Sequence, residues 1–239
     1  MRRDLPELPA AWPPSYPPHR PVPADVSRRL DTDAEEAHGV PSLVLMEHAS
    51  MGVAALARHM VGPGDRIVVL CGPGNNGGDG YGAARFLASW GLAPRVLRCS
   101  RRPPPKGDAA AEVRWAALET MAEDAWAEPA LVAEAAREAD LVVDALFGVG
   151  LDRDLDAPFP AWIEAVNAAS ALRLAVDVPS GLDADTGHLR PVAVRADVTA
   201  TMAMPKEGLV THPSGALHAG TVVEVDIGLP GPLHRPYAL

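Results

Sequence analysis

Residues 66–82 read RIVVLCGPGNNGGDGYG, and this stretch decides the fold class. Its apolar run at residues 67–71 is rich in β-branched side chains and is followed by glycines, which is typical of a strand buried on both faces. The glycine-rich loop after it leads into a predicted helix from Asp79 to Gly91, and residues 94–100 predict a second strand. The stretch therefore predicts a βαβ unit, the building block of a parallel sheet.

Strand and helix patterns alternate along the rest of the chain. Apolar runs that end in glycine loops predict strands at residues 140–150 and 172–181. This alternation predicts an α/β protein, a three-layer α/β/α sandwich with a Rossmann-like, mostly parallel sheet. Helical spacing of apolar residues predicts helices at residues 25–39, 42–61, 108–121, 129–139 and 157–170. In the C-terminal part of the chain, apolar runs follow one another with little room for helices between them. We expect short strands that extend the sheet at residues 196–204, 207–212 and 220–228.

The first 24 residues differ from the rest of the chain. Eight prolines interrupt them, which excludes a helix or a central strand and predicts an extended, polyproline-like arm. Because such arms are more often loose than docked, we expect a loose terminus. Residues 25–239 predict a single α/β domain.

Composition excludes several classes of protein. A formal charge of −10 over 239 residues would repel a phosphate backbone, so we expect no nucleic-acid partner. No apolar run is long enough to cross a bilayer, and no apolar segment follows Arg2 and Arg3 as in a secretory signal. Cys71 and Cys99 each end a predicted strand and form no spaced framework, which indicates reduced thiols in a cytoplasmic protein.

Three loops at the carboxyl ends of predicted strands are rich in glycine and oxygen ligands. Ligands of doubly wound sheets bind at this edge. Residues 72–77 match G-x-G-x-x-G, a pattern that lets a helix N-terminus approach a diphosphate. A dinucleotide site would also place an acid after the second strand, where this chain has Arg98, Arg101 and Arg102. These arginines either admit a 2′-phosphate or are solvated surface charges.

These loops also contain acidic and amide side chains that the dinucleotide-binding pattern does not require. Asn75, Asn76 and Asp79 are surplus to the dinucleotide motif, and three within five positions favour ligand contact over turn formation alone. Asp144 and Asp177 each end an apolar strand, where they serve either as caps or in chemistry. Because Asp177 emerges beside a rigid Pro-Ser-Gly turn, it is a candidate for acid–base work.

Four motifs, taken in order, resemble one family. They are GPGNNGGDGYGAARFLASWG at residues 72–91, DALFGVGLDR at 144–153, VDVPSGLDADTG at 176–187 and ADVTATMAMPKEGL at 196–209. Together they resemble the NAD(P)H-hydrate epimerases, whose domain is the YjeF N-terminal domain, over roughly residues 25–230. The chain departs from that family at Val149, where a threonine is common, and at His48 and Ser50, where asparagine and glycine are common.

The resemblance implies an activity. Members of that family interconvert the R and S epimers of NADHX and NADPHX, in which water has added at carbon 6 of the nicotinamide ring. A separate NAD(P)HX dehydratase, specific for one epimer, then recovers the coenzyme. Because no dehydratase-like segment follows in this chain, we expect that enzyme to be a separate protein or to be absent. The resemblance also implies a three-layer α/β/α fold, a homodimer and one bound potassium ion (K⁺) per subunit.

The resemblance further implies roles for individual residues. Asp177 is expected to contact the substrate and act as the catalytic acid–base group. Lys206 is expected to position the substrate or tune Asp177, with a surface lysine as the alternative. The implied potassium ligands are Asn76, Asp144 and Ser180. The other implied substrate contacts are Asn75, Asn76, Gly77, Gly78, Asp79, Gly148, Val149, Gly150, Leu151, Asp152, Arg153 and Asp154.

Three alternative functions stay open. An NADP-dependent oxidoreductase explains the G-x-G-x-x-G pattern and the arginines but leaves the oxygen-rich loops unexplained. A non-catalytic nucleotide-binding or protein-interaction module of the same fold is the second, although Asn76, Asp144, Asp177 and Ser180 together argue for catalysis. A phosphate-binding kinase is the third, weakened because the chain lacks G-x-x-x-x-G-K-[ST].

Overall fold

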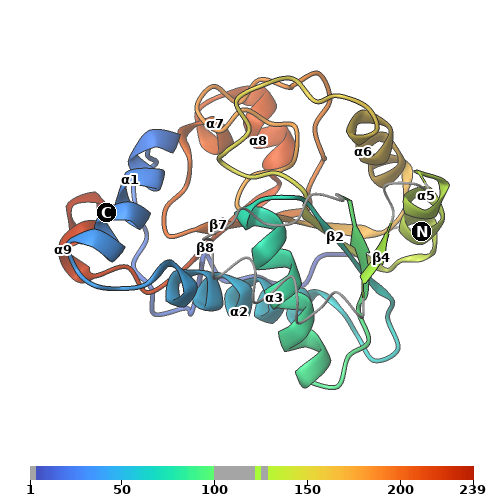
Figure 1. Cartoon of the computed structure of the whole chain (residues 1–239), viewed down its shortest axis with the longest axis horizontal. Helices are drawn as coiled ribbons and strands as arrows, with labels where there is room; N and C mark the ends of the chain where they lie inside the picture. Colours follow the sequence, from blue (N-terminus) through green and yellow to red (C-terminus); the bar gives the residue numbers. More distant parts are fainter. Residues whose placement is uncertain (1–3, 100–121, 125–128) are drawn as a thin grey trace.

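A parallel β-sheet forms the centre of the molecule (Figure 1). The computed structural model describes residues 4–99, 122–124 and 129–239. Within these residues the sheet has eight strands in the order β1-β8-β7-β6-β5-β2-β3-β4, and each neighbouring pair is parallel. The strands are β1 (Ala11–Trp12), β2 (Ile67–Cys71), β3 (Arg95–Arg98), β4 (Ala122–Asp124), β5 (Leu141–Ala145), β6 (Leu172–Val176), β7 (Val198–Met202) and β8 (Thr221–Val225).

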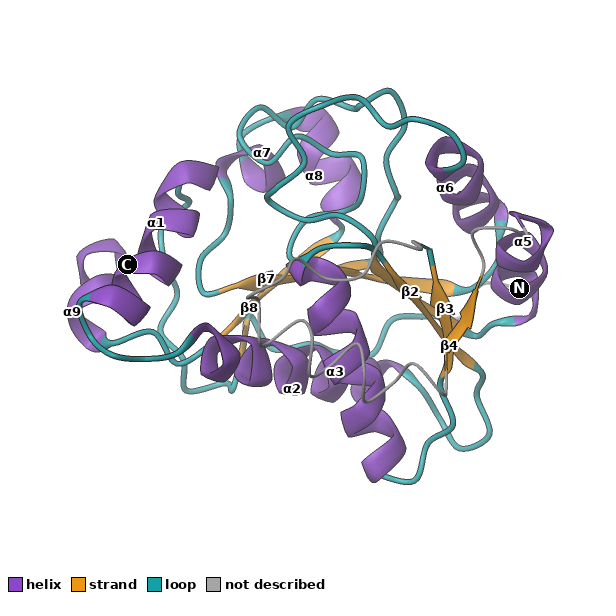
Figure 2. Cartoon of the chain, viewed as in Figure 1, coloured by secondary structure: helices purple, strands orange, loops and turns teal. Residues whose placement is uncertain are grey.

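Helices cover both faces of this sheet (Figure 2). One face is covered by α2 (Ser42–Met60) and α3 (Asn75–Ser89), and the other by α5 (Pro129–Glu138), α6 (Phe159–Ala168), α7 (Glu207–Val210) and α8 (Pro213–Ala219). Beside the sheet lie α1 (Ala24–Glu36), α9 (Gly231–His234) and the 3₁₀ helix η1 (Arg235–Tyr237). The predicted three-layer α/β/α fold is confirmed. Among the helices of the described residues, none is both long and apolar enough to cross a bilayer.

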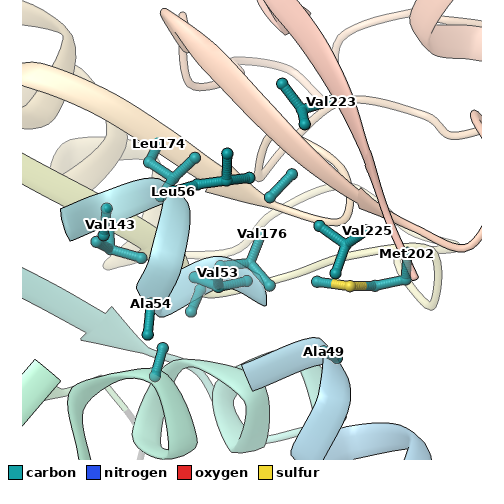
Figure 3. Packing of buried hydrophobic residues seen from close by; sticks show 14 of the residues in the cluster. Ala49, Val53, Ala54, Leu56, Val143, Leu174, Val176, Met202, Val223 and Val225 are labelled. Atoms are coloured by element: carbon teal, nitrogen blue, oxygen red, sulfur yellow. The ribbon is translucent and has the colours of Figure 1, made fainter. Parts of the chain in front are cut away.

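Successive side chains of the central strands point into two hydrophobic cores, one on each face of the sheet, as expected for a sheet buried on both sides. Val143 faces α2 and α3, where it packs with Val53 and Leu56 (Figure 3). Val69 belongs to the same cluster. Val68 and Val142 face the opposite way and pack with Trp162 of α6 and its neighbours. The continuous apolar runs in the sequence reflect this burial, since neither face of the central strands meets water.

Helix α3 lies unusually close to the sheet. A Cβ atom at Gly80 would stand 2.5 Å from Cβ of Ala145 and 3.0 Å from Sγ of Cys71, so glycine is required for this approach. The close contact holds the first turn of α3 against the carboxyl ends of β2 and β5. That turn contains Asn75 and Asn76, and Asp79 follows directly after it.

Two local predictions differ from the structure. The helix predicted from Asp79 begins four residues earlier, at Asn75, so most of the supposed loop is its first turn. Residues 207–212, predicted as a strand, contain the short helix α7 instead. A run this short does not show a clear periodicity, so its sequence is compatible with a strand or a helix. In the structure it is helical, and Leu209 packs with Val178 and Ala219. The helix predicted at residues 108–121 lies outside the described residues.

The N-terminal arm is docked, which corrects the expectation of a loose terminus. Its β1 pairs with β8, at the edge of the sheet opposite β4. The buried His19 then donates its backbone N–H to Oε1 of Glu224, 3.1 Å away, while its Nδ1 lies 2.8 Å from Oε2. Further along, the N–H of Val22 donates to the carbonyl of Pro205 at 2.9 Å, directly before Lys206. The arm therefore covers an edge strand that would otherwise expose unpaired backbone groups.

Candidate functional site

The candidate site is a cavity of about 420 Å³ at the carboxyl ends of the strands. Its wall combines α1, the turn between β2 and α3, residues 146–151 after β5, Asp177 after β6 and Met202 at the end of β7. Parallel sheets bind ligands at this edge. A second cavity, of about 400 Å³, lies at the opposite ends of β2 and β3 and contains none of the predicted site residues.

Asp177 and Lys206 form an ion pair in the wall of the cavity. Lys206 has no exposed surface, and its Nζ donates to Oδ1 of Asp177 at 2.5 Å. The same ammonium group donates to the carbonyl of Met202 at 2.9 Å and to Oγ1 of Thr201 at 3.3 Å. Its three protons are thus used, and Lys206 holds the Asp177 carboxylate in one position. The alternative of a surface lysine is wrong.

The backbone at Asp177 is strained. Asp177 has a φ of 65°, and a tight turn around it places the N–H of Val178 2.8 Å from the carbonyl of Val176. Left-handed conformations cost a residue other than glycine free energy, and they cluster at functional sites where the surrounding structure enforces them. Here the turn directs the carboxylate toward residues 146–151, where its Oδ2 accepts a hydrogen bond from the N–H of Val149 at 3.0 Å.

Asp144 and Ser180 form a second polar group, deeper in the structure. Both are fully buried. The N–H of Ser180 donates to Oδ2 of Asp144 at 2.8 Å, and its hydroxyl donates to Oδ1 at 2.6 Å. Burial raises the pKa of Asp144 to about 6, although hydrogen bonds from Ser180 and Leu146 oppose the rise. Ser180 also ties this group to the cavity, since its Oγ accepts a hydrogen bond from the N–H of Phe147 at 2.9 Å.

Asn76 faces Asp177 across Gly148. A Cβ atom at Gly148 would stand 2.8 Å from Oδ1 of Asn76 and 2.9 Å from Oδ2 of Asp177, so glycine leaves a gap between the two polar groups. The Nδ2 atom of Asn76 is buried and makes no hydrogen bond within the part of the chain that the structure describes. Buried amide groups are seldom left unsatisfied, so this atom indicates a bound ligand.

Comparison with known proteins assigns the family. The family model described as YjeF-related protein N-terminus matches residues 42–208. The chain belongs to this family. It is 41% identical over 190 residues to an NAD(P)H-hydrate epimerase of Limosilactobacillus fermentum, covering 79% of this chain and 87% of the relative. It is 36% identical over 217 residues to an NAD(P)H-hydrate epimerase of Rhodopirellula baltica, covering 89% of this chain and 86% of the relative.

Other relatives in the YjeF-related family are longer. The chain is 42% identical over 220 residues to the bifunctional NAD(P)H-hydrate repair enzyme Nnr of Salinibacter ruber, covering 87% of this chain and 40% of that protein. The chain thus spans about two fifths or less of the bifunctional relatives it matches. Among solved structures, yeast ynu0 superimposes with a TM-score of 0.71 at 23% identity, covering 86% of this chain and 87% of ynu0, which shows a shared fold.

The structure brings together only part of the residue set expected from the family resemblance. The cavity is lined by Asn75, Asn76, Asp79 and Asp177, and by residues 148–151. Gly77 and Gly78 are buried inside α3 and do not line it. Three further residues of the expected substrate loop, Asp152, Arg153 and Asp154, are exposed outside the cavity. Arg153 forms an exposed ion pair with Asp156 at 3.8 Å.

Sequence reasoning missed the contribution of α1. Ser27, Arg28 and Asp31 line the cavity, and Nη1 of Arg28 donates to the carbonyl of Val149 at 2.9 Å. Burial raises the pKa of Asp31 to about 6; the charge of Lys206 lowers it and that of Asp177 raises it further. In the sequence these residues form the polar side of an amphipathic helix. A polar helix face that lines a cavity looks the same in sequence as one that meets solvent.

The oxygens around Asp144 have the chemistry that a hard cation prefers. The Ser180 hydroxyl lies 2.6 Å from Oδ1 of Asp144 and 3.1 Å from the carbonyl of Phe147. Rotating the amide of Asn76 would present its oxygen in place of the unsatisfied Nδ2. Carboxylate, hydroxyl, carbonyl and amide oxygens suit K⁺, and a cation would offset the cost of burying Asp144. Within the described residues, no group of three or more His, Cys, Asp or Glu side chains could hold a metal ion, so a thiolate or imidazole site is not indicated.

Proposed function

We propose that the chain is an NAD(P)H-hydrate epimerase that interconverts the R and S epimers of NADHX and NADPHX. Relatives that this chain covers over most of their length bear that name. One observation supports the proposal most directly: the Asp177 carboxylate, fixed by the buried Lys206, opens into a cavity at the ligand-binding edge of the sheet. This arrangement suits proton transfer to and from a bound substrate.

Binding of the diphosphate is assigned to the first turn of α3 and to residues 148–151. Free N–H groups and the positive end of the helix dipole favour a phosphate at a helix N-terminus. Asn75 and Asn76 begin α3 and line the cavity, and Arg28 adds a positive charge at the same wall. Asp79, directly after the first turn, lies in the cavity wall and is largely buried. A cation nearby would reduce its repulsion of the phosphates.

The proposed chemistry centres on Asp177. Asp177 gives a proton to the carbon-6 hydroxyl, the C–O bond breaks with its electron pair on oxygen, and water leaves. The lone pair of the ring nitrogen then forms a C=N bond, which gives a planar, iminium-like ring. The Asp177 carboxylate stabilises this cation and accepts a proton from the water that adds again at carbon 6. Lys206 acts as a positioning residue, because its ammonium group donates hydrogen bonds to Asp177, Thr201 and Met202.

A potassium ion is proposed at Asn76, Asp144 and Ser180. When bound, it would supply positive charge that offsets the carboxylates beside the anionic substrate. Asp144 and Ser180 would hold it from the buried side, and Asn76 would close the site from α3.

Further features of the proposed function concern partners and location. We propose that the protein acts as a homodimer in the cytoplasm, with one potassium ion per subunit. An NAD(P)HX dehydratase that accepts one epimer would consume the product. Without epimerisation, such a dehydratase would leave the other epimer unused.

The test follows the ratio of R to S hydrate by chromatography after purified protein is given one isolated epimer. The wild-type protein should reach the equilibrium ratio faster than buffer alone. Asp177→Asn should remain folded and lose roughly 10²- to 10⁴-fold of this rate, whereas Asp25→Asn, on the exposed side of α1, should not. A wild-type protein no faster than buffer would contradict the proposal and favour a non-catalytic nucleotide-binding module.

A further inference from the structure

The inference rests on the proposed function and concerns the second face of the nicotinamide ring. The R and S hydrates carry the carbon-6 hydroxyl on opposite faces. Inversion therefore needs departure of the hydroxyl from one face and addition of water to the other. Because an acid or base must lie within hydrogen-bond reach of the proton it transfers, a single fixed carboxyl serves one face only.

Asp177 is such a fixed carboxyl. Its Oδ1 is held by Nζ of Lys206 at 2.5 Å, and its Oδ2 by the N–H of Val149 at 3.0 Å. The N–H of Asp177 itself donates to the carbonyl of Ala200 at 2.7 Å, which fixes the strained turn after β6. Asp177 therefore serves the ring face that turns toward the ends of β6 and β7, and it cannot swing across the cavity.

Asp31 enters the same cavity from another wall. It lies on α1, one turn after Ser27, which also lines the cavity. Figure 1 shows α1 beside the sheet, whereas Asp177 follows strand β6 of the sheet itself. The side chain of Asp31 remains open toward the cavity, and within the described residues no hydrogen bond or ion pair occupies its carboxyl. A flat ring bound between the two walls would present one face to each carboxyl.

Burial brings the pKa of the Asp31 carboxyl closer to neutral pH, whereas the charges around it act in opposite directions. Arg28 shares its helix, Asp79 lines the cavity from α3, Asp177 lies after β6, and Lys206 lies after β7. Burial raises the pKa of Asp31 to about 6, with Lys206 lowering it and Asp177 raising it. A carboxyl with this pKa gives and takes protons readily near neutral pH.

We propose that Asp31 is a second catalytic residue, which transfers the proton on the ring face opposite Asp177. In one direction the Asp31 carboxyl gives its proton to the departing hydroxyl, and the C–O bond breaks with its electron pair on oxygen. The ring nitrogen supplies the pair that forms the C=N bond. Water then adds to the other face as Asp177 takes its proton. The reverse reaction uses the same two groups with their roles exchanged.

Oxygen exchange in H₂¹⁸O separates the two faces. Each isolated epimer is incubated with the protein, and chromatography with mass spectrometry reports both inversion and ¹⁸O incorporation. Wild type should place ¹⁸O in both epimers and invert both. Asp31→Asn should invert roughly 10²- to 10⁴-fold more slowly from either epimer. From the epimer whose hydroxyl faces Asp177, it should still incorporate ¹⁸O with retention of configuration.

Two further variants complete the experiment. Glu35→Gln, one turn further along α1 and exposed outside the cavity, should behave as wild type. Asp31→Glu, which keeps the acid, should recover part of the inversion that Asp31→Asn loses. Wild-type inversion by Asp31→Asn would overturn the proposal. It would also be overturned by equal losses of exchange and inversion from both epimers, or by a change in KM alone, because Asp31 would then only bind the coenzyme. A wild-type protein that exchanges neither epimer refutes the proposed function itself.

Discussion

The Nζ atom of the fully buried Lys206 lies 2.5 Å from Oδ1 of Asp177, so each side chain is the other's ion-pair partner. The pair joins two turns that follow neighbouring parallel strands, β6 and β7. Val22 of the docked arm covers the peptide before Lys206. Taking one partner away leaves a charge in a place from which water is largely excluded.

Replacing Lys206 by methionine should therefore destabilise the protein. We expect the free energy of unfolding at pH 7 to fall by about 3–5 kcal/mol, the usual cost of breaking a buried ion pair. Adding Asp177→Asn to Lys206→Met should recover part of that loss, because the unpaired charge is removed. Urea denaturation measures both effects. Arg137→Met, at an exposed position on α5, is the control, and an equally small change in both methionine variants would contradict the prediction.

Gly148 and Gly150 offer a matched pair of substitutions in one loop. A Cβ atom at Gly148 would press on Asn76 and Asp177, whereas a Cβ atom at Gly150 would meet nothing within 4 Å. Gly148→Ala should displace both polar groups and lower kcat/KM for epimerisation by roughly 10²-fold, the scale of a 1 Å misplacement. Gly150→Ala leaves Asn76 and Asp177 in place, so its effect on kcat/KM should be smaller. Equal effects of the two alanines would show that the gap at Gly148 plays no part in catalysis.

The sheet could be predicted because its signal is local. Buried runs such as residues 67–71 and 141–145 are short, mostly apolar and followed by glycine-rich loops, which is typical of strands in a parallel sheet. The start of α3 was predicted too late because Asn75, Asn76, Gly77 and Gly78 have low helix propensity. Tertiary contact overrides that propensity here, since Gly80 packs the helix against Ala145.

The site was less predictable than the sheet. Asp177 could be found because it ends an apolar run. Burial of Lys206 depends on the arm and on two neighbouring turns, and no local pattern reports such contacts. The role of Asp31 could not be predicted for a related reason. Its helix has the polar side expected of any surface helix, and only the fold shows that part of this side lines a cavity.

The carboxyl of Asp183 predicts how stability changes in acid. Burial raises its pKa, but hydrogen bonds from Thr186 and Arg190 outweigh this and lower the pKa to about 2. A lowered pKa stabilises the folded state above the unfolded value of about 4, and this stabilisation disappears as the pH falls toward 2. Asp183→Asn should therefore be less stable than wild type at pH 7, and the difference should shrink between pH 4 and pH 2. Urea midpoints across this range test it, and a difference that is constant with pH would contradict it.

Potassium binding should be visible as stability, independent of any activity. A ligand at a hundredfold excess over its Kd stabilises the folded state by about 2.7 kcal/mol, which for a chain of this size raises Tm by roughly 5–10 °C. Replacing choline chloride with potassium chloride at constant ionic strength should therefore raise the Tm of the wild type. Ser180→Ala removes the hydroxyl beside Asp144 and should remove most of this rise. Ser89→Ala, on the exposed end of α3, should keep it. The same Tm in both salts, or a full rise in Ser180→Ala, would mean that no cation binds at Asp144.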